Sequence, residues 1–102
     1  MNARVVRLLG LGLSGGGGRV VVGVAGVRAQ LQRDALHCVV LAGDASPRTL
    51  EKVERLARAR GVPIVRGPGA FALGHGLGRP PVQAVGVADA ALARGLVGSL
   101  EE

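Results

Sequence analysis

Short aliphatic runs alternate with amphipathic stretches along most of the chain. Four runs of mainly Val, Leu, Ile and Ala have the length and composition of buried strands. These are residues 19–22, 37–42, 63–66 and 82–88. Four stretches with apolar residues at helical spacing follow them. These are residues 24–33, 47–60, 70–77 and 90–97. The alternation predicts one central sheet covered by helices on both faces.

The most clearly marked helix is residues 47–60. Ser46 can cap its N-terminus, Pro47 suits its first turn, and Gly61 lies where a C-terminal glycine is favoured. Glutamates precede arginines by four residues at 51/55 and 54/58, the favourable order on a helix. The predicted core face consists of Leu50, Val53 and Ala57.

The N-terminal part of the chain is less decisive. Residues 3–13 suit a helix or a strand, and the glycine-rich residues 14–18 predict a flexible break. A chain of 102 residues has room for one core, so we predict a single domain over residues 1–102. Its predicted fold is α/β, a three-layer α/β/α sandwich with a central four-stranded mixed sheet. The tail, residues 101–102, is expected to fray.

The chain is basic, with 13 Lys and Arg against 7 Asp and Glu. This balance favours polyanionic partners, although an Arg-, Gly- and Ala-rich composition also follows from GC-rich coding. Arg48, Lys52 and Arg55 form a stripe opposite the predicted core face, and interleaved glutamates favour a solvated surface over phosphate binding there. Arg19, Arg28 and Arg79 are stronger candidates for phosphate contacts, because Gly- or Pro-containing turns lie nearby.

The aromatic content restricts the kind of nucleic acid that the chain could recognise. Phe71 is the only aromatic residue among Phe, Tyr and Trp, so a single-strand stacking platform is not expected. An RNA partner should therefore be a structured element, held through its backbone and shape.

A glycine motif invites a dinucleotide-binding interpretation. Gly10, Gly12 and Gly15 match the fingerprint, with Asp34 roughly where the ribose-binding acid would lie. The fingerprint needs a strand before the glycines and a helix directly after them. Here a strand-like run follows instead, so we interpret the match as a consequence of glycine density.

No other chemistry is indicated. Residues 12–16 match G-x-S-x-G, but the chain is too short for that hydrolase fold, and His75 has no evident oxyanion partner. Cys38 lies in an apolar run and is expected to be a buried, inert thiol. We predict no catalytic residue, no metal site, no cofactor and no small-molecule substrate. No signal peptide or membrane-length run is recognisable, so the expected location is cytoplasmic, without a membrane partner.

Several segments taken together resemble the L7Ae superfamily of kink-turn RNA-binding ribosomal proteins, and within it the small bacterial YlxQ-like branch. The segments are Leu8-Leu9-Gly10-Leu11, Gly18-Arg19-Val20-Val21, Gly23 at the start of a helix, Leu41-Ala42-Gly43-Asp44-Ala45-Ser46, Gly61-Val62-Pro63-Ile64 and Leu73-Gly74-His75-Gly76-Leu77-Gly78. The resemblance covers residues 5–98. It implies an α/β/α sandwich that binds RNA in ribosomal or translation-linked particles.

The resemblance also implies where RNA would bind. Kink-turn binders carry polar residues and a lysine at the positions of Ala25, Gly26 and Ala29, so this chain lacks the side chains that contact the sheared base pairs. Arg28 could replace part of the lost charge. The remaining positions that the resemblance or the local turn chemistry marks as RNA-binding are Arg19, Gly23, Val24, Ser46, Leu50, Arg79, Pro80 and Pro81.

The resulting hypothesis is a non-catalytic RNA-binding protein, associated with ribosomes or translation, with a weakened or altered kink-turn site. Its expected partners are structured RNA, ribosomal RNA above all, and ribosomal proteins. The alternative is a protein-interaction or scaffold module of the same fold that has lost RNA binding. The apolar residues 24–26 at the start of the second helix favour that alternative.

Overall fold

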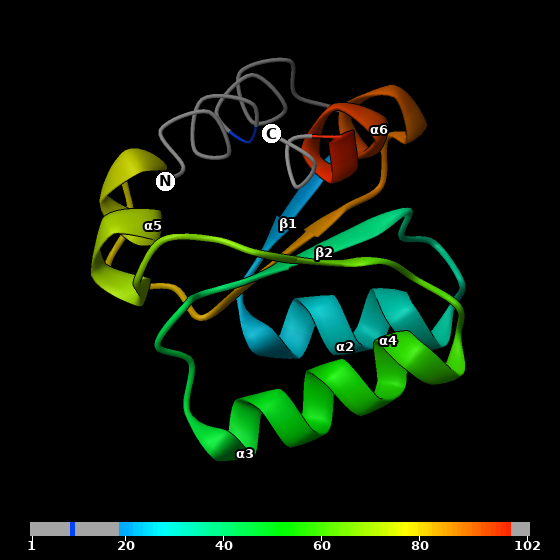
Figure 1. The fold of residues 1–102 in the computed structure, drawn as a ribbon, viewed down its shortest axis with the longest axis horizontal. Coiled ribbons are helices and arrows are strands. Elements are labelled where there is room, and N and C mark those ends of the chain that lie inside the picture. The colour runs from blue at the N-terminus through cyan, green and yellow to red at the C-terminus, as the bar shows by residue number, and fades with distance from the viewer. Residues whose placement is uncertain (1–8, 10–18, 99–102) are drawn as a thin grey trace.

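A computed structural model describes residue 9 and residues 19–98. Its centre is a four-stranded sheet in the order β1-β4-β2-β3 (Figure 1). The strands are β1 (Val20–Val22), β2 (Cys38–Leu41), β3 (Ile64–Arg66) and β4 (Ala84–Val87). Strand β4 runs antiparallel to both β1 and β2, whereas β2 and β3 are parallel. The predicted mixed four-stranded sheet is therefore confirmed.

Helices cover both faces of this sheet, as predicted (Figure 1). One face carries α2 (Val24–Gln32) and a continuous helical segment made of α3 (Pro47–Thr49), a π-helical stretch (Leu50–Glu54) and α4 (Arg55–Ala59). The other face carries α5 (Ala70–Gly76) and α6 (Ala90–Gly98). None of the described helices is long and apolar enough to cross a membrane.

The core consists of two aliphatic clusters, one on each side of the sheet. Along β2, Cys38 and Val40 belong to the cluster under α5 and α6, and Val39 and Leu41 belong to the cluster under α2 and α4. This alternation follows from the two-residue period of a strand. All four residues are fully buried, which explains why β2 is a continuous apolar run in the sequence.

The predicted elements are found close to their predicted ends, with two informative differences. Gln83 precedes β4 instead of lying inside it, and its side chain joins two loops. The helix over residues 47–60 contains the π-helical stretch, where we expected regular α-helix. Ser46 caps that helix by accepting a hydrogen bond from the backbone N–H of Thr49 at 3.2 Å, as predicted.

Some predictions concern residues that the structure does not describe. The helix or strand at residues 3–13, the break at residues 14–18, both glycine motifs and the tail lie outside the described residues. Leu9 is the exception, because it is helical and fully buried in the cluster under α5 and α6.

Candidate nucleic-acid interface

Three segments of the predicted interface meet at one end of the sheet. The backbone N–H of Gly23, just after β1, donates to the carbonyl of Ala84 at 2.9 Å. The N–H of Ala42, just after β2, donates to the carbonyl of Gln83 at 2.9 Å. The Gln83 side chain then accepts a hydrogen bond from the N–H of Ser46 at 3.0 Å. The starts of α2 and α3 and the loop before β4 are therefore tied together.

We call this region the sheet-end surface and define it by residues 23–29, 46–52 and 79–83. Gln83 is not among the residues predicted for the interface, and it lies 37 residues from its partner Ser46. The only signal was a polar side chain within an otherwise apolar run.

Helix α2 begins at this surface because of the backbone of Gly23. Gly23 has φ 107° and ψ 150°, a conformation that is open essentially to glycine alone. No side chain caps the helix, so the first-turn amides of α2 have no side-chain acceptor. Val24 is half-buried, whereas Ala25 is exposed.

The three positions where kink-turn binders carry polar side chains differ in their surroundings in this structure. Ala25 and Ala29 are exposed on α2, so their methyl groups face solvent without hydrogen-bonding capacity. A Cβ at Gly26 would lie 2.8 Å from Cγ1 of Val21 on β1. Gly26 therefore allows α2 to approach the sheet closely, and a larger residue there would need that strand side chain to move.

The loop containing Arg79, Pro80 and Pro81 is held against α5. The N–H of Arg79 donates to the carbonyl of Gly74 at 2.8 Å, and the N–H of Val82 donates to the carbonyl of Ala70 at 3.0 Å. A Cβ at Gly74 would overlap the carbonyl oxygen of Pro80, so only glycine permits this approach. All three loop residues are exposed.

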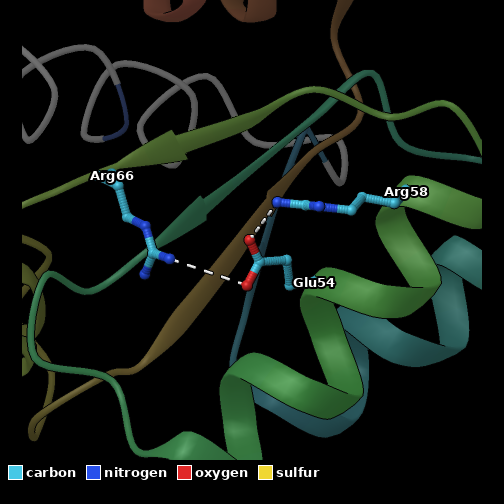
Figure 2. Close-up of polar contacts among 3 residues, drawn as sticks. All are labelled: Glu54, Arg58 and Arg66. Atoms are coloured by element: carbon cyan, nitrogen blue, oxygen red, sulfur yellow. Dashed lines mark hydrogen bonds and ion pairs between the residues drawn. The ribbon is translucent and has the colours of Figure 1, made fainter.

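Several arginines outside the residues of the sheet-end surface are paired with carboxylates. Arg58 Nη2 lies 2.8 Å from Oε1 of Glu54, and Arg66 Nη2 lies 3.8 Å from Oε2 of the same carboxylate (Figure 2). Arg60 Nη1 lies 3.1 Å from Oδ2 of Asp34. These three arginines share two carboxylates, Glu54 and Asp34, so most of their positive charge is compensated locally.

Cations on the sheet-end surface are different. Among the described residues, no carboxylate forms an ion pair with Arg28, Arg48, Lys52 or Arg79. Two further arginines of the described residues are unpaired but lie elsewhere. Arg33 follows the C-terminus of α2, and Arg94 lies on α6. The charge pattern favoured a solvated surface at Arg48 and Lys52, and both residues are exposed. Their place beside Ser46 and α2 adds them to the candidate interface.

Arg28 and Lys52 line a groove of about 400 Å³ between α2 and the π-helical and α4 segments. The Nε atom of Arg28 is buried and has no hydrogen-bond partner among the described residues. Glu51 also lines this groove, and its carboxylate lies 3.9 Å from Nη1 of Arg55. The groove therefore has an excess of positive charge.

Arg19 lies apart from the other predicted interface residues. Its carbonyl accepts a hydrogen bond from the N–H of Ala88 at 2.8 Å, at the end of β1 opposite to Gly23. Its Nε lies 3.6 Å from Oδ2 of Asp89. A hydrogen bond from the backbone N–H of Leu92 lowers the pKa of Asp89, and the charge of Arg19 lowers it further.

Asp34 and Cys38 were considered for other chemistry, and the structure shows the surroundings of each. Both carboxylate oxygens of Asp34 contact Arg60, at 3.1 and 3.2 Å, and Asp34 has φ 55° in the turn after α2. Burial raises the pKa of the Cys38 thiol to about 12, in agreement with the prediction of a buried, inert thiol. No three metal-ligating side chains gather among the described residues.

Comparison with known proteins decides the family. The model of the ribosomal protein L7Ae/L30e/S12e/Gadd45 family matches residues 11–97, which is most of the chain. The chain belongs to this family. The superfamily resemblance inferred from the sequence motifs is therefore confirmed.

Two solved structures show the same fold as this L7Ae/L30e/S12e/Gadd45 family member. The first is a protein of unknown function from Bacillus halodurans C, with 25% sequence identity and a TM-score of 0.89. The match covers 99% of this chain and 100% of the Bacillus chain. The second is the 15.5kD RNA binding protein of Giardia lamblia, with 23% sequence identity and a TM-score of 0.76. The match covers 95% of this chain and 84% of the Giardia chain. No curated protein matches the chain.

Proposed function

We propose that this protein is a non-catalytic RNA-binding protein that holds structured RNA on the sheet-end surface. The observation that carries the proposal is the concentration of unpaired cations where the starts of α2 and α3 and the 79–83 loop are joined. Arg79 and Arg48 project from two of these segments, and Arg28 comes from the third. Positive charge on a rigid, shaped surface fits the phosphate backbone of a folded RNA.

Backbone groups would add to this charge. The first-turn amides of α2 carry the positive end of the helix dipole and have no side-chain cap, so they suit a phosphate oxygen. The Ser46 hydroxyl is less available, because it already bonds Thr49. Leu50, which is half-buried, and the prolines of the 79–81 loop would supply apolar contact.

The proposed binding mode differs from base-edge recognition of a kink-turn. Ala25 and Ala29 offer only methyl groups, and a side chain at Gly26 would be directed toward Val21. We therefore propose an altered kink-turn site that recognises RNA through phosphates and shape. The motif resemblance supports placing the protein in the YlxQ-like bacterial branch, in the cytoplasm, with ribosomal RNA as the partner.

Alanine substitutions test the proposed surface. Fluorescence anisotropy with a labelled ribosomal RNA hairpin should show affinity losses of about five- to tenfold for Arg79→Ala and for Arg28→Ala, because each removes a phosphate contact. Arg94→Ala is the matched control, since Arg94 is an exposed, unpaired arginine on α6. It should change affinity less than twofold. Unchanged affinity in both test variants would show that the surface is misplaced.

Cosedimentation tests the proposed link to translation. The protein should sediment with ribosomes at low salt, and RNase treatment should release it, because RNA is the proposed anchor. Retention after RNase digestion, together with no affinity for isolated RNA, would instead favour the protein-interaction module. The apolar first turn of α2 would then be the contact surface.

A further inference from the structure

Two exposed rings stack on α5. Phe71 is 71% exposed and is the one large hydrophobic side chain left exposed within the described residues. Its ring lies parallel to that of His75, with an interplanar angle of 8° and a centroid separation of 5.9 Å. The buried side of the helix is filled by Leu73 and Leu77 instead. The core therefore does not require either ring.

The stacked rings lie next to the sheet-end surface. Helix α5 contacts the 79–82 segment through Ala70 and Gly74. Successive helical residues are about 100° apart, so Phe71 and His75 occupy the helix face beside that contact and away from Leu73. Figure 1 shows α5 at the same end of the molecule as the starts of α2 and α3.

The position of α5 is also well anchored. The N–H of Ala70 donates to Oδ1 of Asp44 at 2.7 Å, which ties the start of α5 to the loop after β2. The N–H of Gly43 in that loop donates to the carbonyl of Pro68 at 2.9 Å. The two rings are thus presented from a backbone that is bonded to the same loops as the sheet-end surface.

We propose that Phe71 and His75 form a stacking platform for one unpaired base of the RNA bound at the sheet-end surface. This inference rests on the proposed function. Base stacking on an aromatic ring is favourable for every base, and the nearly parallel ring of His75 extends the aromatic surface that Phe71 presents. Arg79, on the adjoining loop, is free to contact the phosphate of the stacked nucleotide. The sequence alone argued against a stacking platform, because it revealed one aromatic residue and not the stacked pair.

The chain has no Trp and no Tyr, so Phe71→Trp creates a single fluorophore at the proposed platform. Its fluorescence should be quenched by a ribosomal RNA hairpin with an unpaired loop and unaffected by a blunt RNA duplex of equal length. Ala72→Trp is the control, because position 72 is exposed on the same helix but on a different face. Its fluorescence should change little with either RNA.

Binding is measured separately by anisotropy of labelled RNA. Phe71→Ala should weaken hairpin binding about tenfold and duplex binding less than twofold, and Phe71→Leu should behave like Phe71→Ala. The exposed ring contributes little to the core, so the thermal midpoint should be unchanged in each variant. Hairpin binding without quenching of Phe71→Trp and without loss in Phe71→Ala would overturn the platform and leave the proposed function standing. An absence of anisotropy change with either RNA would overturn both.

Discussion

Gly74 occupies a position where a single methyl group would displace part of the proposed interface. Its missing side chain lets the 79–81 loop lie directly on α5, with the Pro80 carbonyl in the space of a Cβ. Gly74→Ala should lower the free energy of unfolding by about 1–3 kcal/mol, because backbone must shift to relieve the overlap. Urea denaturation measures this, and RNA affinity should fall with it.

The matched control for Gly74→Ala is Gly98→Ala. Gly98 is the last residue of α6, and nothing lies within 4 Å of a Cβ built there. This substitution should leave stability unchanged or raise it by up to about 1 kcal/mol. Equal effects of the two substitutions would contradict the close packing of the loop on α5.

Asp89 makes stability depend on pH at the start of α6. The hydrogen bond from the N–H of Leu92 at 2.8 Å lowers the pKa of Asp89 in the folded state below its ordinary value of 3.8. A lowered pKa means that the ionised carboxylate stabilises the fold above the ordinary pKa, and that this stabilisation is lost as the pH falls through the folded-state value.

Asp89→Ala should therefore be less stable than the parent protein at pH 6, and the difference should shrink as the pH falls below 3.8. Thermal denaturation over a pH series measures the difference. Asp89→Asn is the control, because an amide oxygen still accepts from Leu92 but carries no charge. A gap between Asp89→Ala and the parent that stays constant with pH would contradict the assignment.

At the scale of elements, Gln83 connects the loop before β4 to the start of α3. Gln83→Met preserves side-chain length but removes the acceptor for the Ser46 N–H, which is partly buried. We expect a loss of about 1 kcal/mol in unfolding free energy and weaker RNA binding, because the segments lose their mutual alignment. Gln30→Met on α2 is the control, since the Gln30 side chain bonds no described residue. Similar losses in both variants would argue against this connection.

The element order could be predicted from local pattern because each strand is a short aliphatic run and each helix has its own stripe. Ser46 and Pro47 marked a helix start that the structure confirms. The contacts that assemble the site join residues far apart in the chain, as Ser46 and Gln83 do. No local periodicity reveals such a pair. The stacking of Phe71 on His75 also depends on helix geometry and exposure, which composition does not report.

At the scale of the whole molecule, positive charge is unevenly compensated. The net charge is +6, yet Arg58, Arg60 and Arg66 are paired with carboxylates. The uncompensated cations of the sheet-end surface are Arg28, Arg48, Lys52 and Arg79. Arg33 and Arg94 are the other cations of the described residues without an ion pair, and they lie elsewhere. The larger group of unpaired cations lies on one surface, which favours a polyanion bound at that end of the sheet.

The salt dependence of RNA affinity tests this account most directly. Each phosphate contact releases counterions, so four contacts predict a slope of about −3 in a plot of log affinity against log salt concentration. Arg79→Ala should make the slope shallower by about one unit, whereas Arg94→Ala should leave it unchanged. A slope near zero, or one that Arg79→Ala does not alter, would contradict phosphate binding at the sheet-end surface.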